Sequence, residues 1–80
     1  MIQTIKPGIN FVNGTMDLTV LGYTEINGNN LALIIRNCDG MFITVRNLSP
    51  WQEQYAWDWG HYFTDLREAL DDYDARKKDL

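Results

Sequence analysis

Residues 11–45, FVNGTMDLTVLGYTEINGNNLALIIRNCDGMFITV, contain three turn signals that divide an apolar sequence into short segments. Asn13-Gly14 and Asn27-Gly28 favour two-residue β-hairpin turns, because both central residues of such a turn must tolerate positive φ angles. The sequence NCDG at residues 37–40 is typical of a three-residue hairpin loop with Gly40 in the left-handed conformation. The segment therefore predicts antiparallel strands joined by tight turns.

Each turn determines which residues pair across two strands, and the pairing determines which side chains share a face. The three turns predict the pairs Phe11 with Met16, Val20 with Ile35, and Leu33 with Val45. These pairs place one continuous apolar set on a single face: Ile9, Phe11, Met16, Leu18, Val20, Leu31, Leu33, Ile35, Met41, Ile43 and Val45. A four-residue loop at the third turn would break the agreement by moving Ile35 beside Phe42 and Thr44. We therefore expect the three-residue loop and one buried face.

The turns predict a four-stranded antiparallel β-meander over residues 8–12, 15–26, 30–37 and 41–48. Pro7 suits the start of an edge strand, because proline cannot donate a hydrogen bond to a neighbouring strand. Beyond Thr64 the apolar residues follow the helical spacing i, i+3, i+4 and i+7: Leu66, Ala69, Leu70 and Tyr73. We expect an amphipathic helix, capped by Thr64 and ending near Lys77, to cover the apolar face of the sheet. The chain is thus predicted to be a single α+β domain over residues 1–80.

Residues 49–63, SPWQEQYAWDWGHYF, hold six of the ten aromatic residues of the chain. Ser49-Pro50 followed by Gln52 has the pattern of a helix start. We favour a short helical turn over residues 51–59, with three aromatic residues on one side: Trp51, Tyr55 and Trp59. The alternation of aromatic residues at 55, 57 and 59 fits a short strand instead. In either form, we expect most of these side chains to complete a small core and at least one tryptophan to remain exposed.

Composition limits the classes of function. The chain has 80 residues, a net charge of −4 and one cysteine, Cys38. A negative protein is poorly suited to bind nucleic acid directly, because lysine and arginine must neutralise the phosphates. A lone cysteine excludes an internal disulfide and a cysteine-based zinc site, and it favours a cytoplasmic location. No apolar run is long enough to cross a membrane.

His61 is the single histidine of the chain, and its sequence neighbours offer neither a nucleophile nor an acidic partner to orient it. No phosphate-binding or metal-ligand motif is present either. We therefore expect no catalytic residues, no metal and no cofactor.

The leading hypothesis is a small, non-enzymatic protein that acts by binding another protein. Exposed tryptophan is enriched at binding hot spots, and a single helix leaves one face of a sheet uncovered. The predicted contact residues come from the aromatic stretch and from the outer face of the sheet: Trp51, Trp57, Trp59, Tyr23, Phe42, Arg36 and Arg46. The same outer face could join two copies into a homodimer.

The alternative hypothesis is an acidic, anti-CRISPR-like inhibitor of the kind carried by phages and mobile elements. Such a protein would block the basic nucleic-acid site of a host enzyme, with carboxylates in place of phosphates: Asp58, Asp65, Glu68, Asp71, Asp72 and Asp74. Charge mimicry predicts an affinity that falls steeply with added salt, whereas an aromatic anchor predicts little change.

Overall fold

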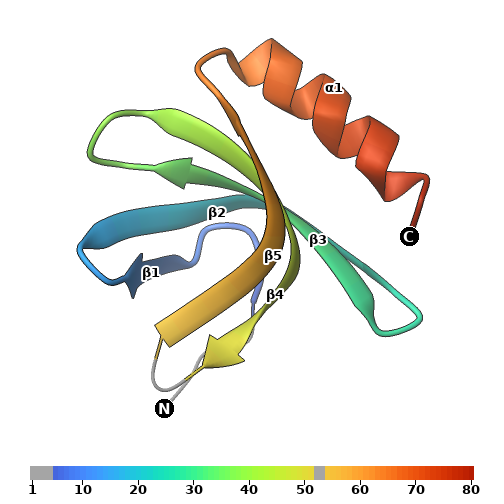
Figure 1. The fold of residues 1–80 in the computed structure, drawn as a ribbon, viewed down its shortest axis with the longest axis horizontal. Coiled ribbons are helices and arrows are strands. Elements are labelled where there is room, and N and C mark those ends of the chain that lie inside the picture. Colours follow the sequence, from blue (N-terminus) through green and yellow to red (C-terminus); the bar gives the residue numbers. More distant parts are fainter. Residues whose placement is uncertain (1–4, 52–53) are drawn as a thin grey trace.

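The computed structural model describes residues 5–51 and 54–80, which form five strands followed by one helix (Figure 1). The elements are β1 (Asn10–Asn13), β2 (Met16–Ile26), β3 (Asn29–Arg36), β4 (Met41–Trp51), β5 (Gln54–Phe63) and α1 (Leu66–Lys77). The strands make one antiparallel sheet in the order β1-β2-β3-β4-β5. The predicted α+β class with a C-terminal helix is confirmed, with one strand more than the four expected. None of the helical residues described form a segment long and apolar enough to cross a membrane.

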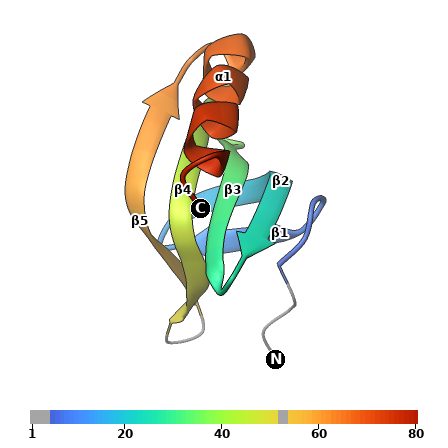
Figure 2. The ribbon, with the colours of Figure 1, turned by 90° about the vertical axis from the view of Figure 1, so that its right-hand side faces the viewer.

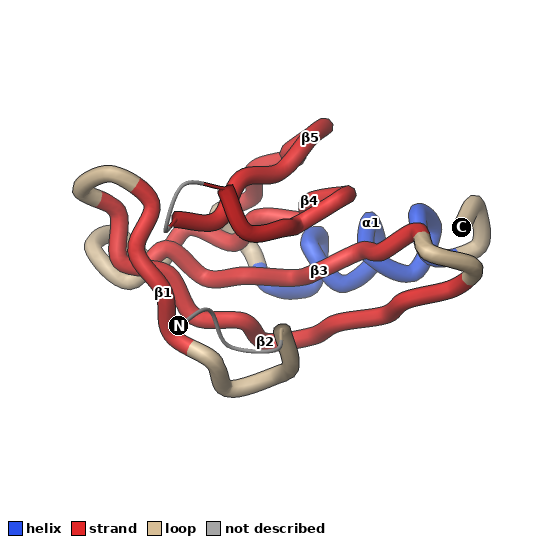
Figure 3. The backbone as a smooth tube through the Cα atoms, turned by 90° about the horizontal axis from the view of Figure 1, so that it is seen from below, coloured by secondary structure: helices blue, strands red, loops and turns tan. Residues whose placement is uncertain are grey.

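The sheet curls so that its first and last strands come together. The rings of Phe11 in β1 and Tyr55 in β5 have centroids 4.8 Å apart. Figure 3 shows the result from below, with β4 and β5 above β2 and β3. The inner face of this curl holds the main core: Ile9, Phe11, Leu18, Val20, Ala32, Ile34, Ile43, Val45, Leu48 and Tyr55. Curling lets a small sheet bury one face against itself without a second layer.

The helix packs on the opposite face, which we call the helix-side face. Figure 2 shows α1 standing against β3 and β4, between β5 and β2. Leu31, Leu33 and Thr44 belong to this face and are buried. The prediction that α1 covers the main apolar face is therefore wrong: the curl fills that face, and α1 covers a second, smaller apolar layer.

Strand β3 is turned over relative to our prediction by two one-residue shifts. The Asn27-Gly28 turn pairs Gly22 with Leu33 as expected, but a β-bulge at Leu21 then pairs Val20 with Ile34 rather than with Ile35. The loop after β3 has four residues, so Ile35 pairs with Phe42 and not with Ile43. The two shifts cancel for β4 and for β2 as far as Val20, whose inward residues are those predicted. β3 and the part of β2 beyond the bulge exchange their faces, so that Tyr23 packs against the inner core and Gly22 faces the helix.

The reason lies in β3 itself. Its residues 31–35, LALII, are apolar without interruption, which is typical of a strand buried on both faces. Ala32 and Ile34 fill the inner core, while Leu31 and Leu33 face the helix. The register of the first hairpin also differs from the prediction, since Asn13, rather than Phe11, pairs with Met16. This shift of two residues along the strand leaves the same side chains on each face.

The aromatic stretch forms strand β5 and the end of β4, so the predicted helical turn over residues 51–59 is wrong. β5 pairs with β4 from Phe42–Phe63 to Trp51–Gln54. Aromatic residues fit a pleated surface well, and β4 offers a complete row of partners. The alternation at 55, 57 and 59 was the correct signal.

The helix begins one residue later than predicted. Asp65, not Thr64, caps it, because the Asp65 carboxylate accepts a hydrogen bond from the backbone N–H of Arg67 at 2.9 Å. The predicted end at Lys77 is confirmed. Ala69 is fully buried, whereas Leu66 and Leu70 are 41% and 43% exposed.

Candidate functional site

Two bulges interrupt the pairing of β4 with β5 and shape this part of the surface. In β4, Asn47 and Leu48 lie opposite Trp57, and in β5, Trp59 and Gly60 lie opposite Val45. The extra residue in β4 turns Leu48 into the inner core, where it is 1% exposed. Outside the ladder, the Asn30 side chain replaces a strand partner: it accepts from the Leu48 N–H at 2.9 Å and donates to its carbonyl at 3.0 Å.

The second bulge holds Trp59 out in solvent. Trp59 has a φ of 54°, in the left-handed region, and its side chain is 74% exposed. That conformation costs a residue other than glycine about 1–2 kcal/mol, and a bulky residue rarely adopts it. A strained backbone that exposes the largest apolar side chain marks a candidate binding position. Among the predicted tryptophans, this is the one shown to be exposed.

The other aromatic residues near Trp59 are packed more closely. Trp57 is half-buried and contacts the inner core. A Cβ atom at Gly60 would lie 3.2 Å from Nε1 of Trp57 and 3.3 Å from Cε1 of Tyr62. Gly60 therefore lets these two side chains approach over the backbone, although Tyr62 remains 53% exposed. The predicted contact at Trp51 concerns a side chain outside the described residues.

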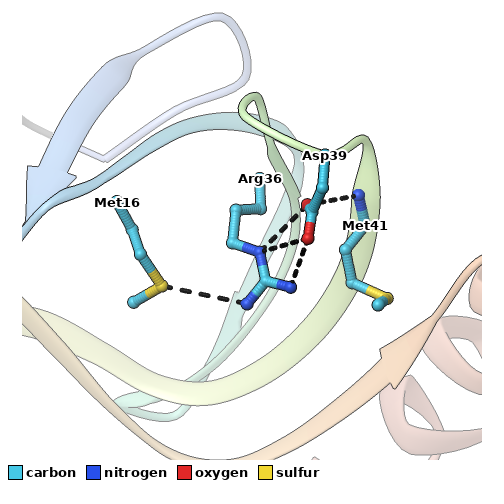
Figure 4. Close-up of polar contacts among 4 residues, drawn as sticks. All are labelled: Met16, Arg36, Asp39 and Met41. Atoms are coloured by element: carbon cyan, nitrogen blue, oxygen red, sulfur yellow. Dashed lines mark hydrogen bonds and ion pairs between the residues drawn. The ribbon is translucent and has the colours of Figure 1, made fainter.

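Arg36 closes the open end of the inner core and does not lie on the outer face as predicted (Figure 4). Its guanidinium group donates to both carboxylate oxygens of Asp39 at 2.6–3.1 Å and lies 3.9 Å from the sulfur of Met16. Asp39 also accepts from the backbone N–H of Met41 at 3.1 Å. The hydrogen bonds from Arg36 hold the pKa of Asp39 below its usual value. Arg36 is thus engaged within the fold.

The remaining outer-face predictions divide between the two faces. Tyr23 packs against the inner core, and burial together with the nearby Glu25 carboxylate raises its pKa. Phe42 lies on the helix-side face beside Ile35, half-buried. Arg46 shares that face, and its buried Nε has no hydrogen-bond partner among the described residues. Because β3 is turned over, the predicted set does not form one surface.

A polar network fastens α1 to the sheet. The hydroxyl of Thr44 donates to Asp72 at 2.6 Å and accepts from Arg76 at 3.0 Å, and Arg76 also donates to the Thr44 carbonyl at 3.0 Å. Burial by itself raises the pKa of the Asp72 carboxyl group. The hydrogen bonds from Thr44 and His61, with the positive charge nearby, outweigh burial and bring this pKa below its ordinary value.

His61 has the acidic partner that the sequence did not reveal. Its Nδ1 lies 3.0 Å from Oδ2 of Asp72, which fixes the orientation of the ring, and its side chain is 51% exposed. The same Asp72 oxygen receives the Thr44 hydroxyl. We therefore interpret the His61–Asp72 pair as part of the attachment of the helix. The described residues contain no group of three or more acidic, histidine or cysteine side chains that could hold a metal ion.

The six acidic residues predicted to mimic phosphates have different structural roles. Asp65 caps α1 and Asp72 belongs to the polar network. Asp58 accepts from the Asn47 side chain at 3.3 Å. Glu68, Asp71 and Asp74 are exposed, and their spacing of three residues places them in one row along the solvent side of α1. The six residues together do not form a single acidic face, because Asp65 and Asp72 are engaged within the fold.

No protein-family model matches this chain, and neither a curated protein nor a solved structure matches it.

Proposed function

We propose that this protein acts by binding another protein, with the indole of Trp59 as the anchor. The carrying observation is that a strand bulge with a left-handed backbone holds this side chain 74% exposed. An anchor whose backbone is already held in position by a strand loses little backbone entropy on binding, and buried tryptophans dominate the energy of many interfaces.

The charges in the segment that contains Trp59 indicate the chemistry of the partner. Residues 58–71 expose one arginine, Arg67, and four carboxylates: Asp58, Asp65, Glu68 and Asp71. Opposite charge at the rim of an interface accelerates association and selects partners. We therefore infer a partner that offers an apolar pocket for the indole, bordered by lysine or arginine.

A basic nucleic-acid-binding enzyme meets this description, so the inhibitor hypothesis is retained as one form of the proposal. For mimicry of a phosphate row the chain offers three carboxylates on one side of α1, Glu68, Asp71 and Asp74, because Asp65 and Asp72 are engaged within the fold. In both forms of the proposal, binding alone accounts for the function and no catalytic group is needed. We therefore propose that the protein is not an enzyme.

Affinity capture with the tagged protein tests the anchor. The bait variants are Trp59→Ala and, as a matched control, Val12→Ala, which trims a side chain that is 53% exposed on strand β1. Capture from a lysate of the producing cells is followed by titration of the purified partner. Trp59→Ala should weaken binding by about 30-fold, corresponding to a hot spot of about 2 kcal/mol, and Val12→Ala should not.

The outcomes separate the two forms of the proposal. Binding that survives added salt and is lost in Trp59→Ala supports the anchor. Binding that falls steeply with salt, resists Trp59→Ala and is lost in the double variant Glu68→Gln/Asp71→Asn supports charge mimicry. Failure to recover any partner at low or high salt argues against both.

A further inference from the structure

The helix leaves part of the helix-side face uncovered. α1 packs against β3, β4 and β5, and towards β2 its Tyr73 hydroxyl is 2.7 Å from the hydroxyl of Thr24. Leu66 and Leu70 precede Tyr73 by seven and three residues, so they lie on the same flank of the helix. Both are more than 40% exposed. The helix thus presents an apolar flank towards β2 with nothing described against it.

Strand β2 contributes two more exposed apolar side chains to this region. Leu21 and Ile26 are 42% and 40% exposed. Ile26 lines a hollow of about 470 Å³ together with Asp74, Lys77 and Lys78 of the helix. At the bulge, Leu21 and Gly22 together lie opposite Leu33, which belongs to the helix-side face. Four of the seven large apolar side chains found exposed in the described chain therefore border one strip: Leu21, Ile26, Leu66 and Leu70.

The same strip runs beside the outer edge of β2. β1 pairs with β2 along residues 16–19, and the last backbone contacts from that side are those of Gly8 and Ile9 with Val20. Beyond Val20, no described residue pairs with the outer edge of β2 as far as Ile26. Along residues 21–26, the N–H and C=O groups that face away from β3 have no partner in the described part of the chain, and such groups form a template for another strand.

The charge at this surface favours a different binding partner from the basic protein proposed to bind Trp59. The charged side chains at the hollow and on the last residues of β2 are Glu25, Asp74, Lys77 and Lys78, whose formal charges are −1, −1, +1 and +1 and sum to zero. Although the whole chain carries −4, this part of the surface adds no net repulsion between two copies. A second copy also brings the same apolar strip and the same free edge.

We propose that two copies of this chain associate through the outer edges of β2, antiparallel about Thr24, into one continuous sheet with the two α1 helices side by side on it. This register puts Thr24 opposite Thr24 of the second copy, and Gly22 opposite Ile26 of the second copy. Tyr23 then faces Glu25 of the second copy. Paired threonines are favourable, the glycine leaves room for the isoleucine, and no like charges are directly opposite. A two-fold axis of this kind is the commonest symmetry of protein dimers.

Sedimentation velocity and equilibrium on the full chain test the dimer. A monomer–dimer equilibrium is expected, and Ile26→Lys or Leu70→Lys should raise its dissociation constant at least about tenfold. Val12→Lys, which changes an exposed apolar residue on β1, should leave the dissociation constant unchanged. Trp59→Ala should also leave it unchanged, so this result is independent of the proposed partner binding. Circular dichroism verifies that each variant is folded.

A disulfide tests the register. Opposite residues of an antiparallel pair have Cα atoms about 4.5–5.5 Å apart, within the range that a disulfide spans. In a Cys38→Ser background, Thr24→Cys should therefore form a covalent dimer on oxidation, and Asn13→Cys should not. A protein that remains monomeric to about millimolar concentration, or a dimer that Ile26→Lys leaves intact, overturns the proposal.

Discussion

Thr44 lies between the sheet and the helix, and replacing it with valine tests how α1 is held. Its side chain is fully buried, and its hydroxyl donates to Asp72 at 2.6 Å and accepts from Arg76 at 3.0 Å. Thr44→Val keeps the shape and the strand propensity of the residue while removing both hydrogen bonds. It also leaves a carboxylate and a guanidinium group with one partner fewer.

The expected loss can be bounded. A hydrogen bond to a charged group contributes about 1.5–3 kcal/mol. Asp72 keeps its contact with His61 and is 23% exposed, so water restores part of the loss. We expect Thr44→Val to lower the free energy of unfolding by about 2–4 kcal/mol. Since a domain of 80 residues has a total of only about 4–12 kcal/mol, the melting temperature should fall by about 10–25 °C.

Urea and thermal unfolding followed by circular dichroism measure this change. Thr44→Ser is the matched control, because it keeps the hydroxyl and removes the methyl group, and it should cost about 1 kcal/mol. The reasoning fails if Thr44→Val is within about 0.5 kcal/mol of the unaltered protein, or if Thr44→Ser is the less stable of the two variants.

Three further outcomes follow from the site. Asp72→Asn should be less stable than the unaltered protein at pH 7, and the difference in stability should shrink below about pH 4. The reason is that a carboxyl group whose pKa is lowered in the folded state stabilises the fold only while it is ionised. Urea midpoints of both proteins, recorded against pH, measure this difference. Gly60→Ala should cost about 1–3 kcal/mol and shift the tryptophan emission, since the new methyl group would lie 3.2 Å from Trp57; an unchanged spectrum would contradict the packing. Trp59→Gly should be more stable than Trp59→Ala by about 1 kcal/mol in thermal melts, the reverse of the usual order in strands, because φ is positive there.

Much of the candidate surface depends on features that the sequence showed only indirectly. Exposed tryptophan was predicted, and Trp59 is exposed, but its place on a bulge depends on the pairing of β5 with β4. Gly22 in the middle of a strand is a known signal of a bulge, and it was the one clue to the displacement at Leu21. The apolar flank at Leu66 and Leu70 was correctly placed on the helix, yet half of the predicted stripe remains exposed.

The turn dipeptides and the change of period after Thr64 are local signals, so they were enough to locate the first three hairpins approximately, the helix and the α+β class. The facing of β3 was different. It depends on a one-residue bulge and a four-residue loop, each of which costs little locally and reverses which side chains point inward. Which side chains of β3 point inward is determined by the burial of both faces of the strand together. The curl that brings β1 to β5 fills one face of β3, and the docked helix covers the other.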